Sequence, residues 1–491
     1  MSDRPSTLRD LEASGYRSRT VRQEMRENLV ARLRSGDDLF PGIIGFEDSV
    51  EPGIVNALLA GHDLILLGLR GQAKTRLLRA LTSFLDPEIP YIVGTPLRDD
   101  PLAPVSPEGR RLVMEHGDDL PIAWLARDER YQEKLATPDV SMADLIGDID
   151  PIKAAARGHS LLDEEAIAYG IIPRANRGLF AINELPDLSP RIQVALLNVM
   201  EERDVQIRGF PVRFPLDLML VFSANPEDYT KRGNLITPLR DRIAAQVHTH
   251  YPRSLEDGMR ITSQEAWTDR DGPRVIVPRI AHELIEEVAN VARASEWVDQ
   301  SSGVSARLTI SLLEAVVSNA ERRAYCTGAD TAVVRLSDFF RATSAITGKI
   351  ELVFEGEREG PEKVATALVG KAAACVFDRR FPDFFSQPDD EGSTYASLAD
   401  HFKRGGEAVC DDGLEDGEAS AELGMPGLTE LVERYLGDLE PEATVFGKEL
   451  VLEGLHQHSV LAREQAEHGP RYSDMVSRMF EDNFDPTGLN G

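Results

Sequence analysis

One short stretch of the sequence carries residues that are suited to binding phosphate groups. Residues 63–75 read DLILLGLRGQAKT, an apolar run followed by a glycine-bearing loop that ends in Lys74 and Thr75. Gly68 and Gly71 allow tight backbone turns, so that loop N–H groups can surround phosphate oxygens. The lysine can reach the outer phosphates, and the threonine hydroxyl can bind magnesium. The stretch therefore predicts a P-loop.

The loop departs from the common pattern at one position. Most P-loops carry glycine directly before the lysine, whereas this chain has Ala73 after Gln72. A chance match to G-x-x-G-x-x-K-T is the alternative, so the prediction needs support from other residues.

Two further apolar runs end in polar residues that suit phosphate hydrolysis. One leads into Asn183 and Glu184, and the other leads into Asn225. A carboxylate at a strand end can activate water, and an oxygen ligand beside it can hold hydrated magnesium. We expect Glu184 to be the general base, Asn183 and Thr75 to be the metal ligands, and Asn225 to orient the attacking water. Because an amide holds the ion less strongly than a carboxylate, Asn183 predicts slow hydrolysis.

Arginines that could stabilise a transferring phosphoryl group follow downstream. Arg240 and Arg242 close the stretch TPLRDR, and Arg307 opens a helical stretch. Guanidinium groups serve this role either within a chain or across an interface between chains. An ordinary surface ion pair is the alternative for each of them.

Short apolar runs predict the elements that must position these side chains. Near-continuous hydrophobicity is typical of strands that are buried on both faces of a parallel sheet. Helical stretches lie between several of the runs, which predicts an α/β fold with ligands at the carboxyl ends of the strands. The five expected strands are 63–67, 89–94, 178–182, 218–223 and 243–248.

Changes in pattern divide the chain into four expected parts. A capping box at Thr20 and Gln23 predicts a helix in the first part. The last part is acidic and helical, with one or two disordered loops expected, at 387–393 and 411–422. The four parts are an N-terminal helical extension (1–38), an α/β nucleotide-binding domain (39–252), a helical lid domain (253–352) and an acidic helical C-terminal domain (353–491).

Composition excludes several classes of protein. The 491 residues carry a formal charge of −29, which disfavours general nucleic-acid binding. The three cysteines, Cys326, Cys375 and Cys410, form neither a disulfide framework nor a metal-ligand pair. No N-terminal apolar segment and no membrane-length apolar run is present in the sequence, so we expect a cytoplasmic protein without membrane insertion.

Four further stretches resemble the AAA+ ATPases, and more narrowly the branch that contains the MoxR proteins and the ATPase subunit of magnesium chelatase. The resemblance covers roughly residues 39–350. It implies an AAA+ core with a five-stranded parallel sheet, an insert in the second helix and a helical lid. It also implies a β-hairpin before the strand that leads to Asn225, called the pre-sensor-1 hairpin. The stretches that carry it are 41–45, 142–151, 169–178 and 193–209.

The resemblance also implies roles for individual residues. Arg242 would be the finger donated to a neighbouring subunit, Arg240 its helper or substitute, and Arg307 the lid arginine that senses nucleotide. Such a finger implies a homo-oligomeric ring, by family a hexamer, with ATP and magnesium as cofactors. The expected nucleotide-binding residues are Ile43, Ile44, Gly68, Gly71, Gln72, Ala73, Lys74 and Thr75.

Three functions remain open from the sequence. The leading hypothesis is a MoxR-like ATPase that remodels or activates a partner protein. That partner would be a separate chain with a von Willebrand factor A (VWA) domain, because no D-x-S-x-S run occurs here. The second is the magnesium chelatase subunit of tetrapyrrole synthesis, against which Ala73, Asn183 and the acidic C-terminal part stand. The third is a DNA motor, which the overall charge disfavours.

Overall fold

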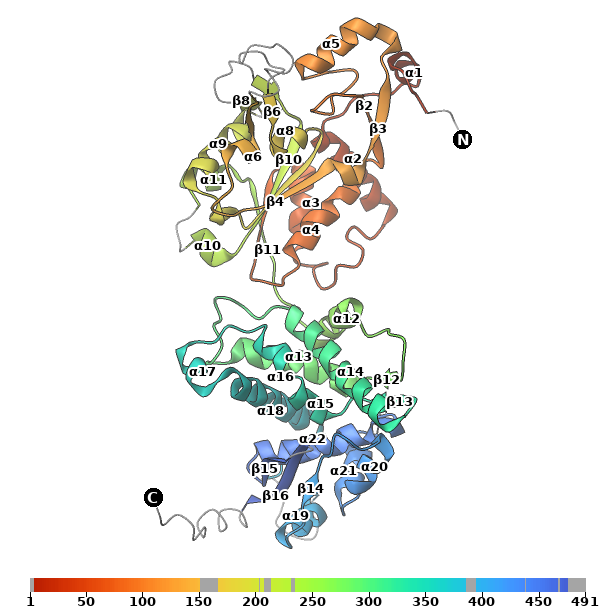
Figure 1. Ribbon diagram of the computed structural model, residues 1–491, viewed down its shortest axis with the longest axis vertical. Coiled ribbons are helices and arrows are strands. Elements are labelled where there is room, and N and C mark those ends of the chain that lie inside the picture. Colours follow the sequence, from red (N-terminus) through yellow and green to blue (C-terminus); the bar gives the residue numbers. More distant parts are fainter. Residues whose placement is uncertain are drawn as a thin grey trace. The chain divides into compact units, whose positions relative to one another are not determined.

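The computed structural model describes residues 4–150, 167–202, 204–206, 213–230, 235–385, 394–437, 439–466 and 469–475. The chain forms two compact units, Met1–His250 and Tyr251–Gly491 (Figure 1). The expected four-part division is finer than this and stays a prediction.

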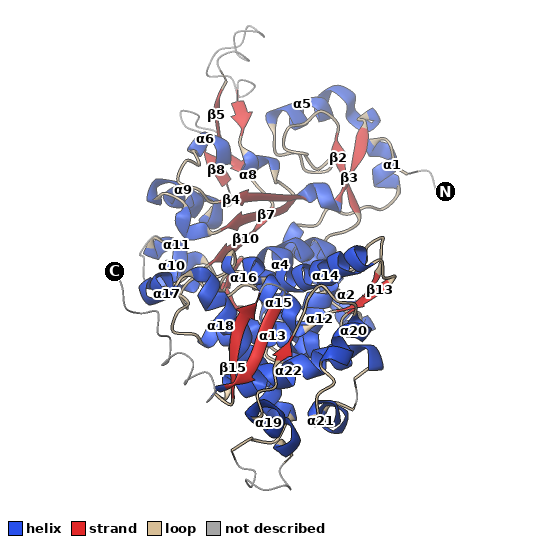
Figure 2. Cartoon of the chain, turned by 60° about the horizontal axis from the view of Figure 1, so that its bottom comes forward, coloured by secondary structure: helices blue, strands red, loops and turns tan. Residues whose placement is uncertain are grey.

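A five-stranded parallel sheet forms the centre of the first unit, with strand order β11-β1-β10-β7-β4. Figure 2 labels three of its strands, β4, β7 and β10. The central strands β7 and β10 are buried along almost their whole length, which explains their near-continuous apolar sequences. The α/β fold class is therefore confirmed. The strands are β1 (Leu64–Leu67), β4 (Tyr131–Leu135), β7 (Gly178–Asn183), β10 (Leu218–Ala224) and β11 (Ala245–His248).

One of the five expected strands was wrong. The apolar run at 89–94 forms β2 (Glu88–Ile92), which pairs antiparallel with β3 (Ile122–Ala126) outside the parallel sheet. The fifth sheet strand is instead β4, which pairs with β7 and stands at the edge of the described sheet. Its middle residues are polar and half-exposed, so a search for apolar runs does not find it.

Helices cover both faces of the sheet. Residues alternate along β1, so that Leu64 and Leu66 join one core and Ile65 and Leu67 join the other. The first core includes α2 (Val21–Ser35), α3 (Glu51–Ala60) and α4 (Lys74–Ala80), and the second includes α9 (Pro190–Glu201) and α11 (Thr237–Arg242). The expected capping box at the start of α2 is present.

Two small antiparallel pairs lie outside the parallel sheet, near stretches that carry the resemblance. One pair joins β5 (Gly147–Ile149) to β6 (Ile167–Tyr169), and β5 lies within the stretch 142–151. The other joins β8 (Asp204–Gln206) to β9 (Arg213–Pro215) as the hairpin before β10, with Val205 opposite Phe214.

The second unit is mainly helical around one hydrophobic core. That core continues from the expected lid residues into the acidic part without a break, through α18 and α22. Short strands that the sequence did not predict also occur, namely the parallel pair β12 and β13 and the three-stranded sheet β14-β16-β15. The main elements are α12 (Leu255–Glu265), β12 (Arg274–Ile276), α13 (Arg279–Ala294), α14 (Arg307–Thr327), β13 (Thr331–Val333), α15 (Leu336–Arg341), α18 (Pro361–Arg380), β14 (Ala408–Val409), α20 (Asp416–Glu422), α22 (Thr444–Gln457), β15 (Leu461–Ala466) and β16 (Gly469–Asp474).

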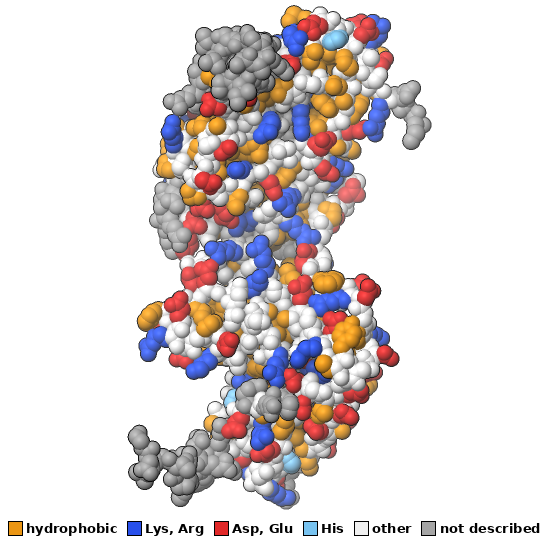
Figure 3. Space-filling view, in the orientation of Figure 1, with side chains coloured by type: hydrophobic (Ala, Val, Ile, Leu, Met, Phe, Trp, Pro, Cys, Tyr) orange, Lys and Arg blue, Asp and Glu red, His pale blue; other side chains and the backbone are white. Residues whose placement is uncertain are grey.

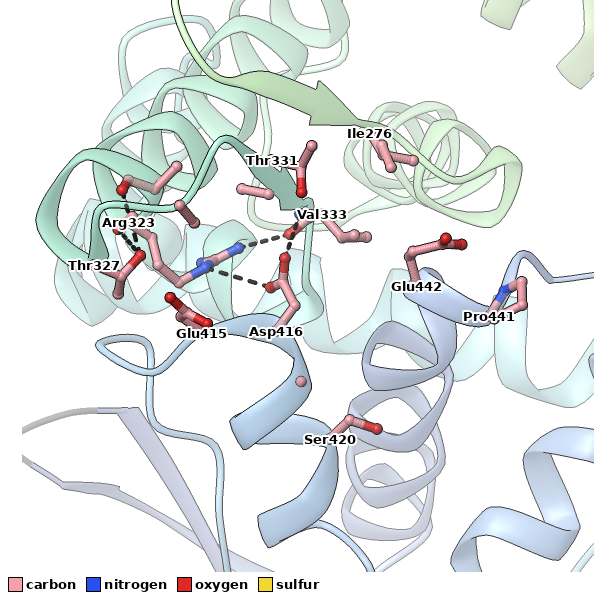
Figure 4. A pocket seen from close by; sticks show the side chains of 14 residues that line it. Ile276, Arg323, Thr327, Thr331, Val333, Glu415, Asp416, Ser420, Pro441 and Glu442 are labelled. Atoms are coloured by element: carbon pink, nitrogen blue, oxygen red, sulfur yellow. Dashed lines mark hydrogen bonds and ion pairs between the residues drawn. The ribbon is translucent and has the colours of Figure 1, made fainter.

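The acidic stretch 411–422 is ordered rather than a disordered loop. Asp416 accepts hydrogen bonds from the backbone N of Val333 at 2.7 Å and from Nε of Arg335 at 2.8 Å. Arg323 contacts the same residue, Val333, and donates to its carbonyl at 2.6 Å (Figure 4). Buried arginines thus provide the partners that charge counting along the sequence cannot show. The other expected loop, 387–393, lies outside the described residues.

Over the described ranges, no helix combines the length and the apolar character that crossing a membrane requires.

Candidate functional site

The P-loop connects β1 to α4 as the sequence predicts. Ala73 stands at the N-cap of α4 with φ 54°, and no side chain caps this helix. The first N–H groups of the helix are therefore available to a ligand such as a phosphate. The left-handed conformation explains why glycine is common at this position, since a Cβ costs roughly 1–2 kcal/mol there.

Lys74 is held by the carbonyl groups of the loop itself. Its Nζ donates to the oxygen of Gly68 at 2.5 Å and to that of Leu69 at 3.0 Å. Burial lowers the pKa of Lys74, while the nearby negative charge of Glu184 acts in the opposite direction. The loop carbonyl groups thus hold the ammonium group at the phosphate loop.

Gln72 has a structural contact that the sequence did not indicate. Its side-chain oxygen accepts hydrogen bonds from the backbone N of Leu69 at 3.0 Å and from Oγ1 of Thr249 at 2.9 Å. Thr249 follows β11 directly and is not among the site residues predicted from the sequence. A threonine after a strand is common, so no local signal singles it out.

The expected metal ligands lie beside each other. Oγ1 of Thr75 is 3.4 Å from Oδ1 of Asn183, which also accepts a hydrogen bond from Oγ of Ser223 at 3.1 Å. The Ser223 hydroxyl in turn accepts from the backbone N of Glu184 at 3.3 Å. Ser223 therefore orients the end of β7, a role that the sequence analysis did not assign. Because β7 and β10 are neighbours, the strand order explains this contact.

Glu184 and Asn225 follow the carboxyl ends of these neighbouring strands. Glu184 has φ 55°, an uncommon conformation for a residue with a side chain. The Oδ1 atom of Asn225 accepts a hydrogen bond from the backbone N of Glu227 at 3.1 Å, at the start of α10 (Pro226–Thr230). The side-chain nitrogen of Asn225 is the part that can donate to a water.

The expected arginines occupy different settings. Arg242 forms an ion pair with Glu201 at the end of α9 and donates to the carbonyl of Pro238 at 3.0 Å. Arg240 on the same helix has an exposed side chain. Arg307 is the first residue of α14, which belongs to the second unit.

The expected adenine contacts lie in the segment before α3. Ile43 is buried in the core that contains α2 and α3, and Ile44 is half-buried. Their contact with a nucleotide stays a prediction.

The donor set fits a magnesium ion that is shared with a nucleotide. In the described parts of the chain, no group of three or more His, Cys, Asp and Glu residues could hold a metal. Magnesium keeps several waters and commonly binds through one or two protein oxygens together with substrate phosphates. Thr75 and Asn183 supply two such oxygens at the phosphate loop.

The sequence is similar to curated subunits of magnesium chelatase, although no protein-family model matches it. It is 28% identical over 241 residues to the magnesium-chelatase 38 kDa subunit of Cereibacter sphaeroides, which covers 47% of this chain and 64% of that protein. It is 27% identical over 242 residues to magnesium-chelatase subunit ChlI of Nostoc sp., which covers 48% of this chain and 60% of that protein. The chain thus spans less than two thirds of the length of these relatives.

Two solved structures that are similar to this chain give low TM-scores. A chain of the complex between subunits BchI and BchD of magnesium chelatase gives a TM-score of 0.35 at 23% identity, and covers 65% of this chain and 98% of that chain. A putative ATPase from Cytophaga hutchinsonii gives 0.29 at 15% identity, and covers 73% and 97%. The chain is thus similar in sequence to magnesium chelatase subunits, and its five-stranded parallel sheet and P-loop are consistent with an AAA+ ATPase of that branch.

Proposed function

We propose that the chain binds ATP with magnesium at its P-loop and hydrolyses it to ADP and phosphate. The observation that carries the proposal is the pair formed by Thr75 and Asn183, with their oxygens 3.4 Å apart beside Lys74 and Glu184. A phosphate-binding loop, a metal-binding pair and a carboxylate at the end of adjacent strands are the parts that phosphoryl transfer to water needs.

Each residue then has a defined role. Lys74 exchanges its loop carbonyl partners for phosphate oxygens, and Thr75 and Asn183 hold the metal. Glu184 accepts a proton from the attacking water, which the amide of Asn225 orients. Bound magnesium would neutralise part of the phosphate charge. Because Asn183 carries no charge, we expect weak metal binding and slow turnover.

The active form is a ring of identical subunits, by family a hexamer. Arg242 or Arg240 of one subunit acts on the nucleotide of its neighbour, and Arg307 senses the nucleotide from the lid. Arg242 must first leave Glu201, because the ion pair occupies its guanidinium group. Arg240 is exposed and needs no such release.

The ring uses ATP to remodel or activate a partner protein, with a separate VWA-domain chain as the leading candidate. The ATPase role in magnesium chelatase is the second candidate, and the similarity to chelatase subunits favours it. A DNA motor is disfavoured by the formal charge of −29. On the face shown in Figure 3, acidic and basic side chains are interspersed, without the continuous basic surface that DNA binding uses. The proposed location is the cytoplasm.

A reconstitution experiment separates the two leading candidates. The purified chain is added, with ATP, to chelatase assays that lack only the ATPase subunit, and separately to candidate VWA-domain proteins. Metal insertion that depends on Glu184 would support the chelatase role. A VWA-domain protein that raises phosphate release, without any metal insertion, would support the remodelling role. If neither partner changes phosphate release, both assignments fail.

A further inference from the structure

A buried hydrogen-bond bridge joins the phosphate loop to the residue that follows β11. Oε1 of Gln72 accepts from the backbone N of Leu69 at 3.0 Å and from Oγ1 of Thr249 at 2.9 Å. The residues Gln72 and Thr249 are only 7% and 8% exposed. Hydrogen bonds that are shielded from water in this way are stronger, and they cost more to leave unmade.

Thr249 at one end of the bridge, and Gly68 next to Leu69 at the other end, are hydrogen-bonded to the sheet. The backbone N of Thr249 donates to the carbonyl of Leu67, the last residue of β1, at 2.8 Å. The backbone N of Gly68 donates to the carbonyl of Ala224, the last residue of β10, at 3.1 Å. The bridge therefore connects the loop to a rigid frame rather than to another loop.

Gly68 leaves the space that the bridge occupies. A Cβ atom at this position would lie 1.8 Å from Oγ1 of Thr249 and 2.3 Å from Oε1 of Gln72. Both distances are far below van der Waals contact, so any side chain here would displace the bridge. The bridge can therefore form only because residue 68, the first glycine of the loop, has no side chain.

We propose that Thr249 is a positioning residue for nucleotide binding, which acts through Gln72 to hold the Leu69 side of the phosphate loop in its binding shape. The inference rests on the proposed function, because it takes the loop to be the phosphate site. A loop that is ordered before the nucleotide arrives does not have to be ordered during binding, which strengthens affinity. Thr249 itself needs no contact with the nucleotide.

The Kd of a fluorescent ATP analogue, measured with the full chain, tests the positioning role. Thr249→Val keeps the shape of the side chain but removes the hydroxyl, and we expect a roughly three- to tenfold rise in Kd. Gln72→Met removes both hydrogen bonds and should weaken binding at least as much. Because both changes break the same bridge, the double variant should bind no worse than Gln72→Met alone. Thr249→Ser keeps the hydroxyl and should bind like the wild type.

Amide hydrogen exchange provides a second measurement that needs no nucleotide. In Thr249→Val, the peptide that contains Leu69 should exchange faster than in the wild type and in Thr249→Ser, while thermal unfolding stays close to that of the wild type. Three results would each overturn the inference. They are a wild-type affinity in Thr249→Val, losses that add up in the double variant, and unchanged exchange at Leu69. A wild-type chain that binds no ATP would overturn the proposed function, and the positioning role would fall with it.

Discussion

The hydroxyl of Thr75 lies 3.4 Å from the side-chain oxygen of Asn183, across the gap between the phosphate loop and the end of β7. These two residues are 108 positions apart, and the parallel sheet brings them together. The amide oxygen of Asn183 is fixed by Ser223, which donates to it at 3.1 Å. The two expected metal ligands therefore lie together, and neither of them carries a negative charge.

Asn183→Asp should strengthen magnesium binding. A carboxylate of the same size attracts the ion more strongly than an amide does, so the magnesium concentration for half-maximal activity should fall several-fold. Phosphate release measured over a magnesium titration checks this. Ser223→Ala is the matched control in the same contact and should shift the titration the other way. An unchanged magnesium dependence in Asn183→Asp would show that residue 183 does not contact the ion.

Ala73→Gly should stabilise the first unit. Ala73 has φ 54°, a conformation that glycine adopts without strain. The relief is partly offset by the greater freedom of glycine in the unfolded chain, so we expect a gain of about 0.5–1 kcal/mol in the free energy of unfolding. Urea unfolding measures the change. Ala195→Gly within α9 is the control and should lose about 1 kcal/mol. A loss of stability in Ala73→Gly would contradict the strain argument.

The sequence predicted those parts of the fold and site that leave a local signal. The glycines of the loop, the apolar run before Asn183 and the capping box at Thr20 are all readable from neighbouring residues. Strand β4 was missed because an edge strand needs fewer apolar residues. Thr249 and Ser223 were missed because their partners are distant in the sequence, so only the folded sheet shows the contacts. The same reason explains why the acidic stretch around Asp416 was taken for a disordered loop.

Glu201→Gln should release Arg242. The ion pair between Glu201 and Arg242 holds the guanidinium on its own subunit, and the amide of glutamine holds it less strongly. If Arg242 is the finger, Glu201→Gln should raise the ATPase rate of the assembled ring, and Arg242→Ala should lower it by at least tenfold without weakening ATP binding. The test measures the ATPase rate of each variant, and of Arg240→Ala, as a function of protein concentration. A large loss in Arg240→Ala alone would move the finger to Arg240.

The free energy of unfolding of the second unit should fall as the pH rises from about 4.5 to about 7. Burial raises the pKa of Glu449 from 4.5 to about 7, despite hydrogen bonds from the backbone N and hydroxyl of Ser337 at 2.7 and 3.2 Å. The folded protein therefore keeps a proton that the unfolded chain loses above about pH 4.5, so the free energy of unfolding decreases between pH 4.5 and 7. The loss from this group is at most about 3 kcal/mol.

Glu449→Gln tests this assignment. Glutamine does not titrate, so the variant should show a smaller decrease in the urea midpoint between these pH values than the wild type. Glu442→Gln removes one exposed charge and is the matched control. Equal pH dependence in the wild type and in Glu449→Gln would rule out this carboxyl as the source.

The most direct test of the ATPase assignment is phosphate release from ATP by the wild type and by Glu184→Gln, with magnesium and at concentrations that allow assembly. We expect release by the wild type, slow but dependent on magnesium, and a loss of at least a hundredfold in Glu184→Gln while ATP binding is retained. Equal rates in the two proteins would contradict the role of Glu184. A wild type that binds ATP but never releases phosphate would contradict hydrolysis at this site.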